Sequence, residues 1–216
     1  MQPFERFTAV AAPLRVPKID TGQILPGRYM RRHRRPGHDY AEAFLHDLRF
    51  DEHERPRPDF PLNQPPWRDA RILVTDVDFG CGSSREGAAY AVLDSGIRAL
   101  IGPSFGDIFA ANCMQNGVLP VVLDYAAIHL LWDQLLAAPG ATITIDLPAQ
   151  LVLAPDGAAF GFAINALRKE RLIRGIDDVT ATLAHLDAIA EFEAARRRRL
   201  PWLPRVAPDF LADATG

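Results

Sequence analysis

Cysteine is scarce in this sequence. Two cysteines, Cys81 and Cys113, occur among 216 residues, and no Cys-x-x-Cys pair is present. A zinc ribbon or a thioredoxin-type redox site needs such a pair, so the sequence argues against both. Two thiols also fall short of the set of protein ligands that an iron–sulfur cluster normally takes. Any iron–sulfur chemistry connected with this chain would therefore need ligands from another chain.

Long apolar runs and an excess of basic charge are missing as well. No apolar stretch approaches the length needed to span a bilayer, and residues Met1–Arg6 lack the basic start and apolar core of a secretory signal. The formal net charge of −3 argues against a nucleic-acid-binding protein, which is usually clearly basic. We therefore expect a cytoplasmic protein whose partners include neither membranes nor nucleic acid.

The sequence does have a glycine- and serine-rich stretch, Asp78–Gly87, between a strand pattern and a helix pattern. The apolar run Ile72–Val74 precedes it and predicts a buried strand. The alanine-rich segment Ala88–Leu93 follows it and predicts a helix that ends near Gly96. We expect a functional site at this tight turn between a strand and a helix.

The residues of this turn suit an anion. Gly80 and Gly82 permit a backbone path that residues with a Cβ resist. Ser83 and Ser84 stand where hydroxyl groups cap a helix, beside N–H groups that have no partner within it, and such helix starts bind anions. Arg85 adds a planar cation that matches a carboxylate. A simple helix cap is the alternative, whereas a nucleotide cradle is disfavoured because the Walker and Gly-x-Gly-x-x-Gly patterns are both missing.

Strand and helix patterns alternate through the middle of the chain. We expect strands at residues 4–11, 72–74, 98–101 and 118–123, and helices at 40–48, 88–93, 104–116 and 126–136. This alternation is typical of an α/β fold with parallel strands. The first strand is expected to end before Pro13, and the very apolar strand at 118–123 is expected to be buried on both faces. Ser104 and Asp107 match a capping box.

The remaining segments are expected to be connections, a hairpin region and C-terminal helices. Residues 17–26 read as a loop, and the proline-rich residues 55–67 read as an extended surface connection. Strands are expected at 141–145, 150–153 and 160–162, followed by helices at 167–174 and 178–199.

Several long segments, taken in order, resemble one known family. They are Lys18–Pro26, Phe79–Glu86, Ala99–Phe109 and Asn112–Pro120. Together they resemble the small subunits of 3-isopropylmalate dehydratase, in the aconitase superfamily. The resemblance extends to about Arg199. It implies a swivelling β/β/α domain, with a mixed sheet and flanking helices, as a single domain over residues 1–200, followed by a tail at 201–216.

The resemblance implies a hydro-lyase that is active only as a complex. The family isomerises 2-isopropylmalate and 3-isopropylmalate in leucine biosynthesis by removing water and adding it back. The partner would be a large subunit that binds a four-iron four-sulfur cluster, and this chain would bind no cofactor and no metal. The small-molecule partner would be the hydroxy-acid substrate.

The same resemblance assigns roles in the glycine- and serine-rich stretch. Ser83 would be the catalytic base, and Ser84 and Arg85 would bind carboxylates of the substrate. The residues that would position the loop are Gly80, Gly82 and Glu86.

An upstream segment is expected to contribute to substrate binding too. The resemblance places Asp20 and Thr21 near the active-site face, although the residues alone equally fit an Asx or Ser/Thr turn. Arg28 begins a basic run, residues 28–38, that would form an electropositive rim and draw an anionic acid inward. A solvated surface loop is the alternative for this run.

Two positions depart from the family pattern. Gly22 stands where a second Asp is usual, and Gly87 stands where a His is usual. The loss of an imidazole leaves the predicted base and Arg85 in place but leaves the choice of substrate open. The alternatives are a related hydro-lyase subunit for another substituted malate, of the dimethylmalate or methylmalate type, and a non-catalytic partner that binds an organic acid.

Overall fold

The chain divides into two compact units. The computed structural model describes residues 1–31, 40–82 and 85–203. By their contacts, Met1–Asp177 form the first unit and Asp178–Gly216 the second. The expectation of one domain over residues 1–200 with a tail at 201–216 stays a prediction.

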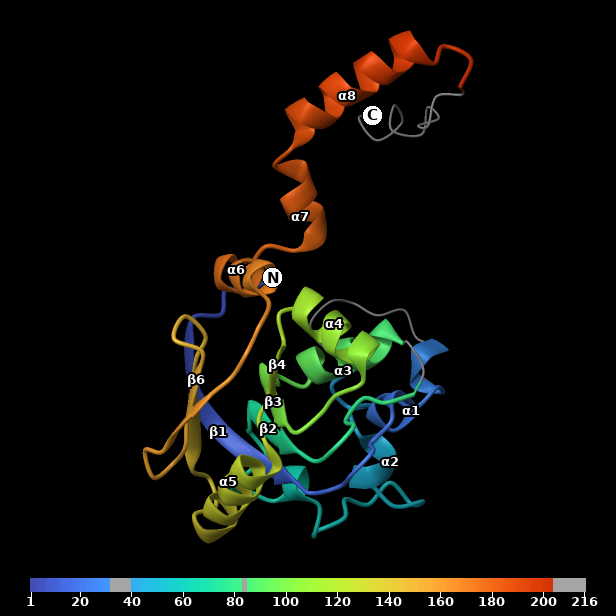
Figure 1. Cartoon of the computed structure of the whole chain (residues 1–216). Helices are drawn as coiled ribbons and strands as arrows, with labels where there is room; N and C mark the ends of the chain where they lie inside the picture. Colours follow the sequence, from blue (N-terminus) through green and yellow to red (C-terminus); the bar gives the residue numbers. More distant parts are fainter. Residues whose placement is uncertain (32–39, 83–84, 204–216) are drawn as a thin grey trace. The chain divides into compact units, whose positions relative to one another are not determined.

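The first unit is built on a seven-stranded mixed sheet with the strand order β4-β3-β2-β1-β5-β6-β7 (Figure 1). Strands β1 to β4 pair in parallel, whereas β5 to β7 pair antiparallel with β1 and with one another. The strands are β1 Arg6–Leu14, β2 Ile72–Thr75, β3 Ala99–Gly102, β4 Leu119–Val122, β5 Thr142–Asp146, β6 Leu151–Leu153 and β7 Ala159–Gly161. The predicted α/β class with parallel strands is confirmed.

Helices cover both faces of this sheet. They are α1 Thr21–Ile24, α2 His46–Arg49, α3 Glu86–Asp94, α4 Asp107–Gln115, α5 Tyr125–Ala137 and α6 Ala166–Arg174, with 3₁₀ turns η1 Tyr29–Arg31 and η2 Pro61–Asn63. In one apolar core, helices α1, α2, α3 and α4 pack against Leu73 and Leu100. In a second core, α5 and α6 pack against Ile72 and Ile101. Neighbouring strand residues thus enter opposite cores, as the pleat of a strand requires.

Strand β1 is longer than predicted, because Pro13 lies inside it. Ala11 donates its N–H to the Ala141 carbonyl at 3.1 Å, on the β5 side. Pro13, two residues on, points its nitrogen to the same side. No residue of β5 lies opposite Pro13, because β5 starts at Thr142, which pairs with Val10. The N–H that proline lacks therefore costs the sheet no hydrogen bond.

Strand β4 lies at the edge of the sheet, and the prediction that it is buried on both faces is wrong. Leu119 and Val121 are buried, whereas Val122 is 54% exposed. Leu119 donates its N–H to the Arg98 carbonyl on the β3 side at 2.9 Å. The next residue, Pro120, therefore points its nitrogen to the open edge. A proline there suits an edge strand, because it removes a donor that another strand could pair with.

The second unit, described to residue 203, contains α7 Asp178–Leu183 and α8 Leu186–Arg199. The prediction of one continuous helix over residues 178–199 is wrong, because a turn in which His185 donates its N–H to the Thr182 carbonyl separates the two helices. Neither helix has a buried residue, so no packing within the unit selects one straight helix. Across the described part of the chain, no helix is both long enough and apolar enough to cross a membrane.

Candidate functional site

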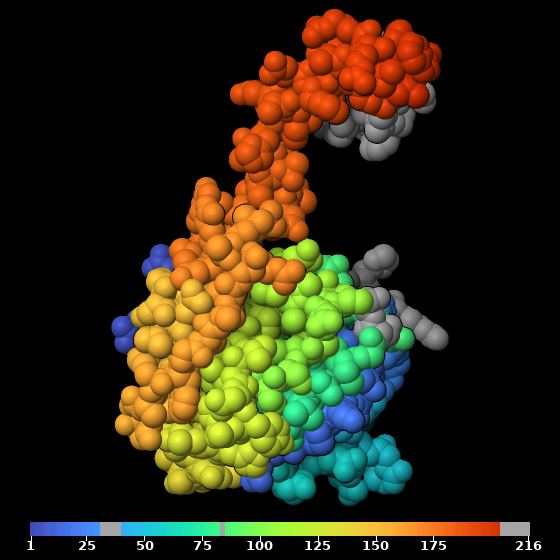
Figure 2. Space-filling view, in the orientation of Figure 1, coloured from blue at the N-terminus to red at the C-terminus, as the bar shows by residue number. Residues whose placement is uncertain are grey.

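The loops that follow β1 and β2 lie side by side at one edge of the sheet. Gly80 donates its N–H to the Ile19 carbonyl at 2.7 Å, and Thr21 donates its N–H to the Cys81 carbonyl at 3.0 Å. Figure 2 shows blue residues of the N-terminal part adjoining the teal residues around position 80. In open α/β sheets, ligands bind outside the carboxyl ends of the strands. This edge is therefore the candidate site.

The loop after β3 joins the same arrangement. Gly106 donates its N–H to the Phe79 carbonyl at 3.1 Å. The Ser104 hydroxyl donates to Asp78 Oδ1 at 2.7 Å and accepts from the Asp78 N–H at 2.8 Å. The predicted capping box of Ser104 and Asp107 is wrong, because Gly106 is the N-cap of α4 and Ser104 bonds the neighbouring loop instead. Three successive loops thus form one hydrogen-bonded frame.

Glycine is required at two points of this frame, because no side chain fits there. Gly80 has a φ of +76°, and an added Cβ would lie 2.2 Å from the Phe109 ring. A Cβ on Gly106 would lie 2.3 Å from the Gly80 carbonyl oxygen. Gly82 has a φ of +87°, in the left-handed region that favours glycine. The loop-positioning role of Gly80 and Gly82 stays a prediction, which this packing supports.

The frame leads directly into helix α3. Ser83 and Ser84, the predicted base and carboxylate ligand, lie outside the described residues. The helix begins at Glu86, and its N-cap, Arg85, makes no side-chain capping hydrogen bond. Glu86, predicted to position the loop, accepts a hydrogen bond from Asn116 Nδ2 at 3.3 Å and so links the start of α3 to the end of α4. First-turn N–H groups and the helix dipole favour an anion at this place.

Arg85 presents its charge at the surface, beside the segment that follows α1. Its Nη1 lies 3.6 Å from Met30 Sδ and 3.7 Å from the position that a Cβ would have on Gly27. Among the residues that the structure describes, no carboxylate lies within ion-pair distance of Arg85. A guanidinium in this setting suits the carboxylate of a ligand.

Asp20 and Thr21, predicted to bind substrate, hold the frame together. Asp20 Oδ1 accepts from the Gln23 N–H at 2.8 Å, and Gln23 Oε1 accepts from the Asp20 N–H at 3.0 Å. This reciprocal pair is a capping box for α1, so the segment expected to be only a loop contains a short helix. Thr21 is buried. Substrate contacts by Asp20 and Thr21 stay predictions.

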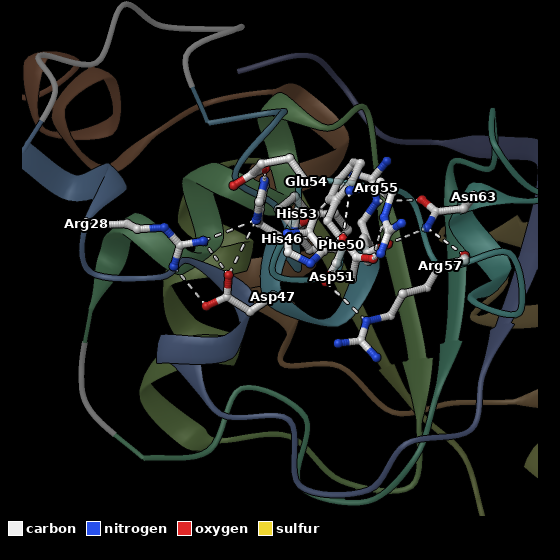
Figure 3. Close-up of polar contacts among 12 residues, drawn as sticks. Arg28, His46, Asp47, Phe50, Asp51, His53, Glu54, Arg55, Arg57 and Asn63 are labelled. Carbon is white, nitrogen blue, oxygen red and sulfur yellow. Dashed lines mark hydrogen bonds and ion pairs between the residues drawn. The ribbon is translucent and has the colours of Figure 1, made fainter.

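Arg28 is paired with a carboxylate. It forms a two-pronged ion pair with Asp47, in which Nη1 donates to Oδ2 at 2.9 Å (Figure 3). Its Nη2 lies 3.2 Å from His46 Nδ1, and its guanidinium lies 4.7 Å from the centre of the Tyr29 ring. Hydrogen bonding to Asp47 raises the pKa of Arg28, and the same bond lowers the pKa of the Asp47 carboxyl group. Substrate binding by Arg28 stays a prediction and would require exchange with Asp47.

His46 and Asp47 were missed by the sequence reasoning, and no local signal marks them. They lie 18 and 19 positions from Arg28 and belong to another element, α2. That helix spans four residues, fewer than the helix predicted at 40–48, and is too short to show a periodic pattern. A pair held together by tertiary structure at this separation leaves no local motif.

The two cysteines have different surroundings. Cys113 is fully buried on α4, and burial raises the pKa of its thiol. Cys81 is partly exposed, with Sγ 3.6 Å from the Lys18 carbonyl oxygen. Metals are bound by the thiolate, which burial of Cys113 disfavours. Across the described residues, no group of three or more His, Cys, Asp or Glu is arranged to hold a metal ion. These residues do not fit an iron–sulfur cluster by themselves.

Three family profiles match the chain in succession. The profile described as "Aconitase C-terminal domain" matches residues 1–126, more than half of the chain. The profile LeuD_N matches residues 129–166. The profile for the C-terminal domain of the 3-isopropylmalate dehydratase small subunit matches residues 178–206, and so extends past Arg199, where the resemblance was expected to end.

Curated relatives align over nearly the whole chain. The 3-isopropylmalate dehydratase small subunits of Rhodospirillum rubrum and Gluconacetobacter diazotrophicus are each 44% identical. The alignments cover 94% of this chain and 98% of the first relative, and 97% of this chain and 100% of the second. A solved structure of 3-isopropylmalate dehydratase from Methanocaldococcus jannaschii matches with a TM-score of 0.64 and 24% identity, and covers 86% of this chain and 99% of that one. This match confirms the predicted fold.

Proposed function

Because the chain belongs to the family of 3-isopropylmalate dehydratase small subunits, we propose that it works with a large subunit to interconvert 2-isopropylmalate and 3-isopropylmalate. This is a hydro-lyase reaction of leucine biosynthesis, in which water leaves the substrate and is added back at the neighbouring carbon. A cytoplasmic location is part of the same proposal.

One observation carries the proposal. The loops after β1, β2 and β3 converge at one edge of the sheet and are joined by backbone hydrogen bonds between them. This frame places Arg85 at the N-terminus of α3, without a carboxylate partner among the described residues. A substrate with two carboxylates needs a cation and N–H donors in such an arrangement.

Three residues share the chemistry in this proposal. Ser83 would take the proton from the carbon next to the one that bears the hydroxyl group, Ser84 would donate a hydrogen bond to a carboxylate, and Arg85 would form an ion pair with a carboxylate. A serine alkoxide is a reasonable base only where positive potential stabilises it. The N-terminus of α3 and the charge of Arg85 supply that potential. The hydroxyl group takes up a proton from solvent and leaves as water. Water would then add in the opposite orientation: its hydroxyl goes to the neighbouring carbon, and the carbon that first bore the hydroxyl takes the proton held by Ser83.

The large subunit is proposed to hold the iron–sulfur cluster, because the two cysteines of this chain do not fit one. A cluster bound there would act as a Lewis acid on the leaving hydroxyl group. The site edge also suits a protein partner. Four exposed apolar side chains, Val16, Ile108, Val122 and Tyr125, lie at or shortly after the carboxyl ends of β1, β3 and β4. Exposed apolar side chains near this edge are available for contact with a partner.

The test is anaerobic reconstitution with the cluster-bearing large subunit from the same source, assayed on 2-isopropylmalate and on smaller substituted malates. Ser83→Ala is expected to lower kcat about a hundred- to ten-thousandfold, the usual contribution of a general base. Ser95→Ala is the matched control. It makes the same change at the other end of α3, where the Ser95 hydroxyl donates a hydrogen bond to the Val92 carbonyl of the same helix, and we expect an unchanged rate.

Each outcome separates the proposal from its alternatives. Turnover of isopropylmalate that depends on Ser83 but not on Ser95 supports the proposal. Turnover of a dimethylmalate or methylmalate instead would favour a related hydro-lyase. Organic-acid binding by the chain alone, together with failure to assemble with the large subunit, would favour the non-catalytic partner.

A further inference from the structure

We propose that His46 is a positioning residue for substrate binding, because it anchors the segment Pro26–Met30, which lies against Arg85. This inference rests on the proposed function, in which Arg85 binds a substrate carboxylate. His46 itself touches neither the substrate nor Arg85 in this proposal. It acts through residues of that segment, called the Arg28 segment below.

The imidazole of His46 joins two parts of the chain by its two nitrogens (Figure 3). Nε2 lies 2.9 Å from Glu54 Oε2, and Nδ1 lies 3.2 Å from Arg28 Nη2 and 3.4 Å from Asp47 Oδ1. A guanidinium only donates hydrogen bonds, so Nδ1 accepts from Arg28 in this arrangement and Nε2 carries the proton that Glu54 accepts. This tautomer satisfies the contacts with Arg28 and Glu54, whereas Asp47 Oδ1, which can only accept, receives no hydrogen bond from an unprotonated Nδ1.

Aromatic packing fixes the same ring from two sides. Its centre lies 5.2 Å from that of Tyr29 and 4.7 Å from that of Phe50, and the Phe50 ring is stacked on it with an angle of 28° between the ring planes. The His46 side chain is only 10% exposed. Arg28 and Tyr29, two neighbours in the Arg28 segment, are thus both held by one imidazole.

The Arg28 segment carries this anchoring to the site. The Tyr29 N–H bonds the Pro26 carbonyl at 2.9 Å and the Met30 N–H bonds the Gly27 carbonyl at 3.2 Å, so the segment is one tight turn. Met30 Sδ accepts from Arg85 Nη1 at 3.6 Å. A shift of Tyr29 therefore moves Met30. Among the described residues, the Met30 side chain is the only one that accepts a hydrogen bond from Arg85.

Glu54, which bonds His46, lies in a turn held by several hydrogen bonds. Glu54 has a φ of +59°, a conformation that a non-glycine residue rarely adopts. The turn is held by Asp51, which accepts from the Glu54 N–H at 3.0 Å through its carbonyl and from the N–H groups of His53 and Arg55 at 2.9 Å through Oδ1. A strained residue in a well-bonded turn points to a role for its side chain. Here that side chain bonds His46.

The test compares His46→Ala and His46→Gln with the control His53→Ala. His53 is a neighbouring histidine with an exposed ring, and Glu52, at 3.6 Å, is its one ion-pair partner among the described residues. His46 lines an open hollow of about 670 Å³ rather than the apolar core, so we expect the His46 variants to fold. Glutamine has both a donor and an acceptor, as neutral histidine has, so it is expected to restore part of the function.

Two readouts decide the proposal. In the isolated chain, His46→Ala is expected to speed hydrogen exchange of the Tyr29 and Met30 amides about tenfold, and His53→Ala to leave it unchanged. In the reconstituted enzyme, His46→Ala is expected to raise KM for 2-isopropylmalate roughly tenfold with little change in kcat, because Arg85 is displaced while the base is not. His46→Gln is expected to fall between His46→Ala and the wild type in both.

Three results would overturn the proposal. Unchanged exchange at Tyr29 and Met30 in His46→Ala overturns the proposal, and so does an unchanged KM in an active enzyme. An equal effect of His53→Ala also overturns it. Failure of the proposed function would appear differently, as a wild-type complex that turns over no isopropylmalate. In that case the exchange rates alone decide whether His46 anchors the Arg28 segment.

Discussion

The two arginines predicted to bind substrate lie in opposite settings. Arg85 has no carboxylate partner among the described residues and stands at the N-terminus of α3. Arg28 is already paired with Asp47 and packed against Tyr29. Only the first can accept a ligand carboxylate without breaking an ion pair, so the structure favours Arg85 as the stronger contributor to affinity.

The elements that hold the two arginines differ as well. The loop before Arg85 is fixed by main-chain hydrogen bonds and by glycine packing at Gly80 and Gly106. The Arg28 segment is a turn that side chains attach to α2, and two of these, Arg28 and Asp47, are each about half exposed. Exposed ion pairs contribute about 0–1 kcal/mol, far less than a clash in a packed frame costs. Substitutions in the first region are therefore expected to cost more stability than substitutions in the second.

The largest effect is expected from Gly80→Ala. The new Cβ would lie 2.2 Å from the ring of Phe109, which is buried, in a backbone conformation that already disfavours alanine. Together the clash and the unfavourable backbone conformation predict a loss of about 2–5 kcal/mol in the free energy of unfolding, measured by urea denaturation. Gly157→Ala is the control, because Gly157 has a φ of +90° and nothing within 4 Å of the added Cβ. Its expected loss is about 1 kcal/mol, and equal losses would contradict the role of packing.

A pair of conservative changes tests the contrast between the arginines directly. Arg85→Lys is expected to lower kcat/KM roughly a hundredfold, because lysine lacks the planar fork that binds a carboxylate at two points. Arg28→Lys is expected to lower it by about tenfold or less, since the ammonium group of the new lysine would still pair with Asp47. Steady-state kinetics of the reconstituted enzyme measure both. A larger loss for Arg28→Lys would reverse our assignment.

Gly87→Ala tests how far the Arg28 segment tolerates change. Alanine is the better helix residue by about 0.5–1 kcal/mol, but its Cβ would lie 2.9 Å from Leu25 Cδ2 and 3.9 Å from Met30 Cε. We expect the free energy of unfolding to change by no more than about 1 kcal/mol, because these opposing effects offset each other. KM is expected to rise severalfold, because Leu25, which directly precedes the Arg28 segment, must shift to admit the new Cβ. Unchanged KM for every malate tested would show that Gly87 has no influence on substrate binding.

Short-range patterns predicted the frame of the site well. The apolar run Ile72–Val74 is β2 without its last residue, and the alanine-rich segment 88–93 lies inside α3. Gly80 and Gly82 do adopt positive φ values. Each of these features depends on neighbours in the sequence, such as the period of apolar residues or the lack of a Cβ, and can therefore be read from a single sequence.

Features set by strand order could not be predicted in this way. Ser104 fits a capping pattern, but β3 lies next to β2, and this brings Asp78 within 2.7 Å of its hydroxyl. Val122 belongs to an apolar run, yet the sheet ends at its strand. The Arg28–Asp47 pair likewise depends on two elements that meet only in the folded chain. The family resemblance supplied the fold, but it left these pairings unseen.

The smallest effect is expected from Asp47→Asn, which removes the charge that holds Arg28. The bond to Arg28 lowers the pKa of Asp47 in the folded chain, so its stabilising effect is present above the ordinary pKa of about 4 and is lost as the pH falls through the lower folded value. Because the pair is about half exposed, we expect Asp47→Asn to cost at most about 1 kcal/mol near neutral pH, less at high salt, and progressively less as the pH falls below the ordinary carboxyl pKa of about 4. Urea denaturation of both proteins across this range measures the difference. A cost that does not shrink as the pH falls would mean that the shape of the side chain matters more than its charge, and the Arg28 segment would then depend on packing, as the frame around Gly80 does.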